Sequence, residues 1–122
     1  MCIRDSTTAA LASISFQTKD IIATLRKDNI KVEKLKIDGG MVENDWFTKH
    51  LATSINRSVL IPDNKESTAL GVAMMAGIAS GLCSEDVLAQ AKTREVRAVT
   101  KKSKEVLAEY EAWKSILEKQ LF

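Results

Sequence analysis

The stretch KLKIDGGMVEND, from Lys34 to Asp45, contains the signal that decides how this chain folds. Apolar and polar residues alternate up to Asp38, the pair Gly39 and Gly40 follows at once, and the spacing then becomes that of a helix. Adjacent glycines are costly in entropy, so they are kept where φ must be positive or where a side chain would obstruct something. That something is either a ligand or another part of the backbone.

Outward from this stretch, apolar spacing predicts alternating helices and strands. Helices are expected over residues 8–27, 42–56, 67–80, 84–91 and 103–121, and strands over residues 32–37 and 58–62. The second helix is expected to start directly after the glycines, with Asn44 in its first turn. The stripes expected to be buried are Leu11, Ile14, Ile21, Ile22 and Leu25 in the first helix, and Leu107, Tyr110, Leu117 and Leu121 in the last.

The order helix, strand, helix, strand, helix and helical tail predicts an α/β fold with parallel strands. Two strands make a thin sheet, so we expect further strands in a longer parent protein. The helix over 67–80 is rich in small residues, including Gly71 and Gly77. Because glycine inside a helix costs about 1 kcal/mol relative to alanine, we expect close packing of this helix on a neighbouring helix or sheet.

The composition of the chain argues against two classes of function, nucleic-acid binding and membrane insertion. The chain has 122 residues, and its 18 lysines and arginines against 16 aspartates and glutamates give a net charge of +2, which argues against a nucleic-acid partner. Lys101, Lys102 and Lys104 cluster, but glutamates follow directly, which is typical of a solvated helix face. No apolar run approaches the roughly 18 residues of a membrane span, and no signal peptide is visible. We therefore expect a soluble, cytoplasmic protein with no membrane partner.

The first six residues, MCIRDS, look foreign to the rest of the chain. They match the translation of a transposon-end sequencing adapter, so we expect residues 1–6 to be non-native and residues 7–122 to be a domain that is incomplete on its N-terminal side. This removes Cys2 from consideration and leaves Cys83 alone. A lone cysteine without a metal-site spacing is expected to be an inert small residue, and no metal ligands are predicted.

The doubled glycine has a functional and a structural interpretation. Ligands of parallel α/β sheets bind beyond the carboxyl ends of the strands, where a glycine turn exposes backbone N–H groups, and Gly39 and Gly40 have that position. Asp-Gly is also a common turn pair. Asn44 could hold a ligand by its amide or bond the turn backbone. Asp38 could orient a metal-bound water or cap the turn, and the structural role is the one we favour.

Four segments resemble the C-terminal domain of the FGGY carbohydrate kinases, in order and at matching spacing over residues 7–122: SISFQTKDII, IDGGMVEND, ESTALGVAMMAG and YEAWKSIL. Xylulose and ribulose kinases share the general plan. The aspartate before the glycines, the aromatic-Gln-Thr of Phe16 to Thr18 and the Tyr-x-x-Trp of Tyr110 to Trp113 are more similar to the glycerol kinase branch.

The resemblance implies one lobe of the actin-like, ribonuclease H-like ATPase fold, in which ATP with Mg²⁺ lies between two lobes. It implies that Gly39, Gly40 and Asn44 bind the nucleotide, and that the parent enzyme transfers the γ-phosphoryl group of ATP to glycerol, giving glycerol 3-phosphate. The catalytic and glycerol-binding residues would lie in the upstream part, so this chain alone is expected to be inactive. The full-length enzyme is expected to be a homo-oligomer. The alternatives are another sugar kinase of the family, of the xylulose or ribulose type, and a non-catalytic α/β binding module.

Overall fold

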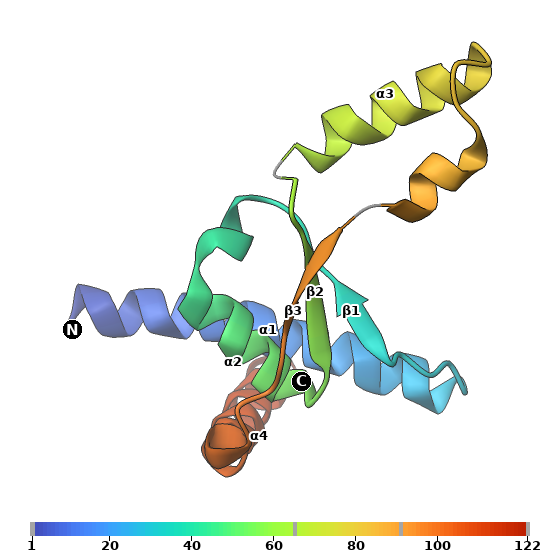
Figure 1. The fold of residues 1–122 in the computed structure, drawn as a ribbon. Coiled ribbons are helices and arrows are strands. Elements are labelled where there is room, and N and C mark those ends of the chain that lie inside the picture. The colour runs from blue at the N-terminus through green and yellow to red at the C-terminus, as the bar shows by residue number, and fades with distance from the viewer. Residues whose placement is uncertain (1, 65, 91, 122) are drawn as a thin grey trace.

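The structure, a computed structural model, describes residues 2–64, 66–90 and 92–121. Helices α1, α2 and α4 pack together beside a small sheet, whereas α3 extends away from the other end of that sheet (Figure 1). In chain order, with η for a 3-10 helix, the elements are α1 (Ile3–Lys27), β1 (Lys34–Lys36), η1 (Gly40–Glu43), α2 (Asp45–Ile55), β2 (Ser58–Pro62), α3 (Ser67–Ala79), η2 (Glu85–Gln90), β3 (Thr93–Val96), η3 (Thr100–Lys102) and α4 (Ser103–Leu121).

The sheet is mixed and has the order β1-β2-β3. β1 pairs with β2 in parallel, as the sequence predicts, with Leu35 opposite Val59. β3 runs antiparallel to β2, with Glu95 opposite Leu60, and the sequence analysis missed this strand. Its sequence, TREV, has a single apolar residue and therefore no alternating pattern to detect. It is a strand because β2 offers it a free edge to pair with.

The main core lies between β2 and α2. Val59 and Ile61 alternate with half-buried residues along β2 and are themselves buried. They form one cluster with Leu51 and Ile55 of α2, and Ile22 of α1 packs against its border. Alternation of this kind is what a half-buried strand requires, so β2 forms where it was predicted, at residues 58–62.

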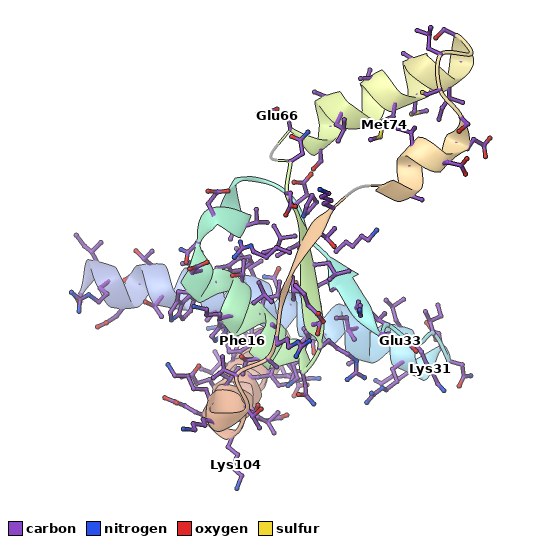
Figure 2. The ribbon with its side chains drawn as sticks, viewed as in Figure 1. Phe16, Lys31, Glu33, Glu66, Met74 and Lys104 are labelled. Atoms are coloured by element: carbon purple, nitrogen blue, oxygen red, sulfur yellow. The ribbon has the colours of Figure 1, made fainter. Side chains whose placement is uncertain are left out.

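A second cluster joins α1 to α4. Phe16 is buried, and its ring centroid lies 5.8 Å from that of Tyr110 and 5.7 Å from that of Trp113. Figure 2 shows Phe16 where α1, α2 and α4 come together. Separations of 4.5–7 Å are those of favourable aromatic pairs. The aromatic residues of the family-like segments are therefore core residues that hold helices together.

Two buried stripes differ from the prediction. In α1, Leu11 and Ile22 pack against the main core as predicted, but Ile14 and Ile21 are exposed. The buried residues are Ala12, Ser15 and Phe16, which the prediction did not include. In α4, Leu107 is 47% exposed; the buried residues of this helix are Val106 and Tyr110, and Leu117 is also exposed. The prediction counted large apolar residues, but small residues such as Ala12 and Ser15 let α1 approach its neighbours closely. The side chain of Leu121 lies outside the described residues.

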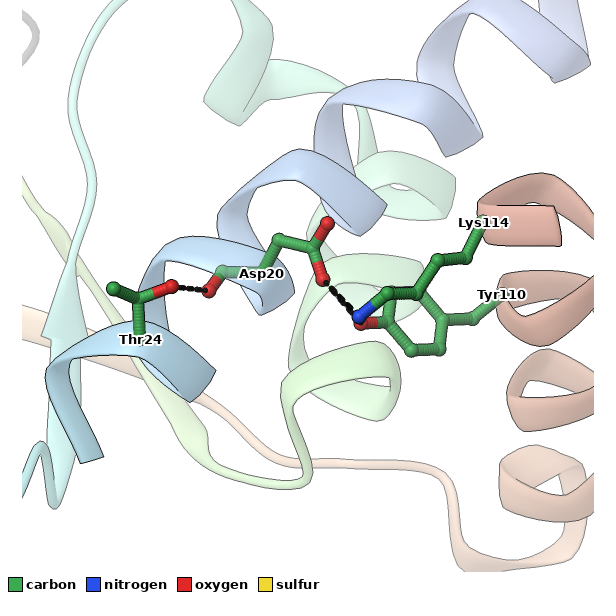
Figure 3. A network of polar contacts seen from close by, with 4 residues as sticks. All are labelled: Asp20, Thr24, Tyr110 and Lys114. Atoms are coloured by element: carbon green, nitrogen blue, oxygen red, sulfur yellow. Dashed lines mark hydrogen bonds and ion pairs between the residues drawn. The ribbon is translucent and has the colours of Figure 1, made fainter. Parts of the chain in front are cut away.

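A polar network reinforces the contact between α1 and α4 (Figure 3). The Tyr110 hydroxyl donates a hydrogen bond to Oδ1 of Asp20, and Nζ of Lys114 lies 3.4 Å from the same oxygen. The Lys19 ammonium lies 4.4 Å from the centroid of the Tyr110 ring. Burial, followed by the Asp20 carboxylate, raises the pKa of Tyr110, so the phenol stays neutral and acts as a donor.

Helix α3 does not pack as predicted. None of its residues is buried, its main contact is with η2, and Figure 2 shows no layer of chain over its outer side. A Cβ on Gly71 would have no atom within 4 Å, whereas a Cβ on Gly77 would lie 2.7 Å from Sγ of Cys83. Gly77 therefore makes room for the turn that carries Cys83. No helix among the described residues is long and apolar enough to cross a membrane.

The segment after α3 also departs from the prediction. The helix expected over residues 84–91 is a 3-10 helix over residues 85–90, and Ala91 lies outside the described residues. The backbone N–H of Val87 bonds the carbonyl of Ser84, while the Ser84 hydroxyl is engaged with the Asp86 carboxylate. Three-residue hydrogen-bonded turns of this kind are typical of short connecting segments.

The Tyr110 network can be tested by removing one oxygen. Tyr110→Phe keeps the ring but removes the bond to Asp20, so we expect the free energy of unfolding to fall by about 1–2 kcal/mol, the range for a hydrogen bond to a charged, partly solvated group. Tyr110→Ala also removes the ring, and about 3–5 kcal/mol is expected. Urea denaturation measures both. Equal stability of Tyr110→Phe and the parent chain would show that the hydroxyl contributes nothing.

Because His50 is buried, we expect the stability of the fold to depend on pH. Its side chain is 7% exposed, and burial lowers its pKa below the usual 6.5, although Glu109 opposes the shift. Above pH 6.5 the imidazole is neutral in both states; below it, the unfolded chain binds the proton more readily, so stability falls as the pH falls. We expect thermal unfolding to show lower stability at pH 5.5 than at pH 7.5. His50→Phe, which removes the only histidine, should lose this difference; an unchanged difference would contradict the assignment.

Candidate functional site

A groove lies at the carboxyl ends of β1 and β2. Because the two strands are parallel, the turn after β1 and the loop after β2 leave the sheet at the same edge. Figure 1 shows the chain passing from β1 over this end of the sheet into η1. The groove has a volume of about 350 Å³, and its walls are Asp38, Gly39, Gly40, Val42, Glu43, Ile61, Pro62, Asp63, Asn64, Glu66 and Arg94.

The two glycines in this wall have different reasons to be glycine. Gly39 has φ of 103° and ψ of 174°, a conformation that side chains rarely adopt, and its N–H donates to Oδ1 of Asp38 at 2.7 Å. Gly40 has no such backbone requirement, and a Cβ built there would have nothing within 4 Å. Asp38 therefore has the structural role favoured from the sequence. Gly40 is one of the residues that line the groove.

Asn44 does not lie inside the second helix as predicted. The glycines lead first into η1, and Asn44 is the N-cap of α2, where its Oδ1 accepts a hydrogen bond from the N–H of Phe47 at 3.0 Å. Asparagine is a preferred N-cap because this bond satisfies a free helix N–H. Asn44 is not among the residues that line the groove. Its amide NH₂ group is the part that remains able to donate outward.

Among the described residues of the groove walls, Asp38, Glu43, Asp63 and Glu66 are acidic and Arg94 is basic. Nη1 of Arg94 lies 3.6 Å from Oδ1 of Asp45, and both side chains are more than half exposed, so this ion pair adds little stability. Carboxylates suit a ligand portion that donates hydrogen bonds, such as hydroxyl or amino groups. No group of three His, Cys, Asp or Glu within the described parts of the chain is arranged to hold a metal ion.

The sequence analysis found part of this site. It located Gly39, Gly40 and Asp38, but not the residues that come from the loop after β2 or from β3. Arg94 was missed because β3 was missed. Asp63 and Glu66 lie in the loop after β2, and only the parallel pairing of β1 with β2 brings that loop opposite the glycines.

Comparison with known proteins assigns the chain to a family. Residues 4–80 match the C-terminal domain of the FGGY family of carbohydrate kinases. The chain belongs to this family. It is 43% identical over 81 residues to a glycerol kinase of Ectopseudomonas mendocina (strain ymp), covering 66% of this chain and 16% of the relative. It is 35% identical over 113 residues to a glycerol kinase of Staphylococcus haemolyticus, covering 90% of this chain and 23% of the relative.

Solved structures support the same assignment. A crystal structure of Plasmodium falciparum glycerol kinase with ADP matches with a TM-score of 0.69 at 28% identity, covering 94% of this chain and 24% of that one. A xyloylose kinase from Brucella ovis matches with a TM-score of 0.70 at 21% identity, which is a likeness of fold. The predicted α/β class, the actin-like lobe and the kinase family are confirmed. The division into residues 1–6 and 7–122 stays a prediction.

The different roles of the two glycines predict different effects of alanine. Gly39→Ala forces a side chain into a conformation reserved for glycine, and we expect it to lower the free energy of unfolding by about 1–3 kcal/mol. Gly40→Ala meets no neighbouring atom, so stability should stay the same or rise by at most about 1 kcal/mol. Urea denaturation of both variants measures the difference. Equal losses would contradict the assignment of the backbone requirement to Gly39 alone.

Proposed function

We propose that the groove at the ends of β1 and β2 binds the adenosine end of ATP or ADP, with Gly39, Gly40 and Asn44 as the contact residues. The observation that carries this proposal is the open space beside Gly40, since no atom of the described residues lies within 4 Å of a Cβ placed there. A ligand that lies against the bare backbone supplies the missing reason. The kinase family and the ADP named with the Plasmodium falciparum structure support the choice of ligand.

Different residues of the chain are proposed to contact different parts of the nucleotide. Gly40 lets the ligand approach the backbone, the Asn44 amide donates to it, and the carboxylates of Asp38 and Asp63 accept hydrogen bonds from ribose hydroxyls or the adenine amino group. The same carboxylates repel phosphates, so the phosphate end points out of the groove. The groove residues do not fit a Mg²⁺ site of their own, and the ion that the family uses is proposed to arrive with the phosphates.

For the longer protein, the proposed activity is transfer of the γ-phosphoryl group of ATP to glycerol. The chain spans 16–23% of the length of these glycerol kinases, and glycerol would bind to the part that is not in this chain. In the structural comparisons, identity of 28% to the Plasmodium falciparum glycerol kinase, against 21% to the xyloylose kinase, favours glycerol over a pentulose as acceptor. A homo-oligomeric cytoplasmic enzyme completes the proposal.

The experiment is an ADP titration of the chain followed by NMR. ADP is expected to shift the amide signals of Gly39, Gly40 and Asn44, with weak affinity because only one wall of the cleft is present. Gly40→Leu places a bulky side chain in the groove, so we expect affinity to fall at least tenfold, or about 1.4 kcal/mol. Gly71→Leu is the matched control, because a Cβ there also meets no atom within 4 Å but lies on α3, outside the groove.

Two results would contradict the proposal. One is the absence of any shift at these positions at millimolar ADP, which would favour the non-catalytic binding module. The other is unchanged ADP affinity in Gly40→Leu, which would mean that the nucleotide lies elsewhere. Since Gly40→Leu fills open space, a folded spectrum of the free variant is expected and separates loss of binding from loss of structure.

A further inference from the structure

A second groove, of about 570 Å³, shares no residue with the groove described above. Its walls include the last turns of α1 and α2 and Arg57, which directly precedes β2, so it lies at the opposite end of the sheet from the doubled glycine. Arg26, Lys27 and Arg57 line it together with Lys19, and none of the described residues that line it is acidic. We call it the basic groove. Its volume is in the range of small-molecule sites.

Arg57 is held in place by the backbone. Its Nε–H donates to the carbonyl of Val32 at 3.1 Å, and Nη1 donates to the carbonyl of Asn56 at 3.0 Å. A guanidinium has five N–H donors, so three of them have no hydrogen-bond partner within the described residues. Arg57 is half-buried, and no carboxylate in the described parts of the chain forms an ion pair with it. A fixed guanidinium with free donors suits an oxyanion that accepts two parallel hydrogen bonds.

The helix ends account for only part of the positive charge. Arg26 and Lys27 lie in the last turn of α1, and Arg57 follows the C-cap of α2, where cations offset the partial negative charge of the terminal carbonyls. Each helix end is equivalent to roughly half an elementary charge, so the two ends together offset about one of these three cations. Neither Arg26 nor Lys27 forms an ion pair with another described residue. An anion from outside the chain is therefore the expected partner of the remaining charge.

Lys19 is placed differently from the other three cations. Its ammonium lies 4.4 Å from the centroid of the Tyr110 ring, and the Glu111 and Asp20 carboxylates lie near enough to oppose the lowering of its pKa by burial. Lys19 therefore already has partners inside the chain. The free positive charge of the basic groove belongs to Arg26, Lys27 and Arg57.

We propose that the basic groove binds a small anion that carries at least two phosphate or carboxylate groups. One oxyanion accepts the parallel hydrogen bonds of Arg57, and a second lies against Arg26 and Lys27. Several charges are needed because one ion contact at 4 Å in bulk water gains only about fivefold in affinity. Phosphate and carboxylate groups are two sources of the same oxyanion chemistry, and the experiment separates them.

The test is an NMR titration of the 122-residue chain with pyrophosphate, citrate and acetate. The ionic strength is held constant, because salt screens exposed charges. Pyrophosphate or citrate is expected to shift the Nε–H signal of Arg57 and the amide signals of Arg26 and Asn56, while the amide of Gly40 stays unchanged. Tighter binding of pyrophosphate identifies a phosphate ligand, and tighter binding of citrate identifies a carboxylate ligand. No shift with either, or equal affinity for acetate, overturns the proposal.

Two variants on α1 make the test specific. The Arg26 side chain is exposed and makes no hydrogen bond or ion pair with a described residue, so Arg26→Gln keeps the fold, and it is expected to weaken binding of the tighter probe at least about fivefold. Arg4→Gln is the matched control, because it removes the same charge from an exposed position of the same helix outside the groove. It is expected to bind as the parent does. Unchanged affinity in Arg26→Gln, or equal weakening in both variants, overturns the proposal.

A third variant tests the shape of the Arg57 group. Arg57→Lys keeps the net charge but replaces the planar fork by a single ammonium group. Binding of the tighter probe is expected to weaken at least about tenfold, although the charge of the groove is the same. The spectrum of the free variant shows whether the fold survives loss of the bond to Val32. Parent affinity in a folded Arg57→Lys contradicts the role given to the guanidinium.

Discussion

The parallel pairing of β1 with β2 is the constraint on which the other features depend. Parallel neighbours require a crossover, and η1 and α2 are that crossover between Lys36 and Ser58. Burial of Val59 and Ile61 against α2 then fixes which face of β2 points inward. The same pairing brings the turn after β1 and the loop after β2 to one edge, so the groove is a consequence of strand direction and not of either loop alone.

The doubled glycine shows that a sequence motif can be interpreted only when the backbone conformation of its residues is known. The sequence alone does not distinguish Gly39 from Gly40, and it allowed two interpretations of the pair: a ligand-binding site or a tight turn. The backbone separates them, because the conformation of Gly39 is required by the turn, whereas no described part of the chain approaches a side chain placed at Gly40. The turn interpretation therefore accounts for the first glycine and not for the second.

The sequence predicted those elements whose pattern is carried by their own residues. Helices α1, α2, α3 and α4 and strand β2 were located because their apolar spacing is long or regular. β3 could not be found, since its pairing with β2 is a long-range contact and its own residues are polar. The buried stripes were misjudged for a related reason. Close approach at Ala12 and Ser15, rather than the size of Ile21, determines which side of α1 faces its partners.

Helix α2 connects the groove at the ends of β1 and β2 with the main core. Its N-cap, Asn44, follows directly on η1, most of whose residues line the groove. Further along the helix, Leu51 and Ile55 belong to the core cluster that holds β2. A helix packed against a strand in this way has little freedom to shift, so the N-cap at Asn44 is held by the same packing. The proposed nucleotide groove therefore adjoins a well-packed helix, and the glycine turn in its wall is the part that carried a sequence signal.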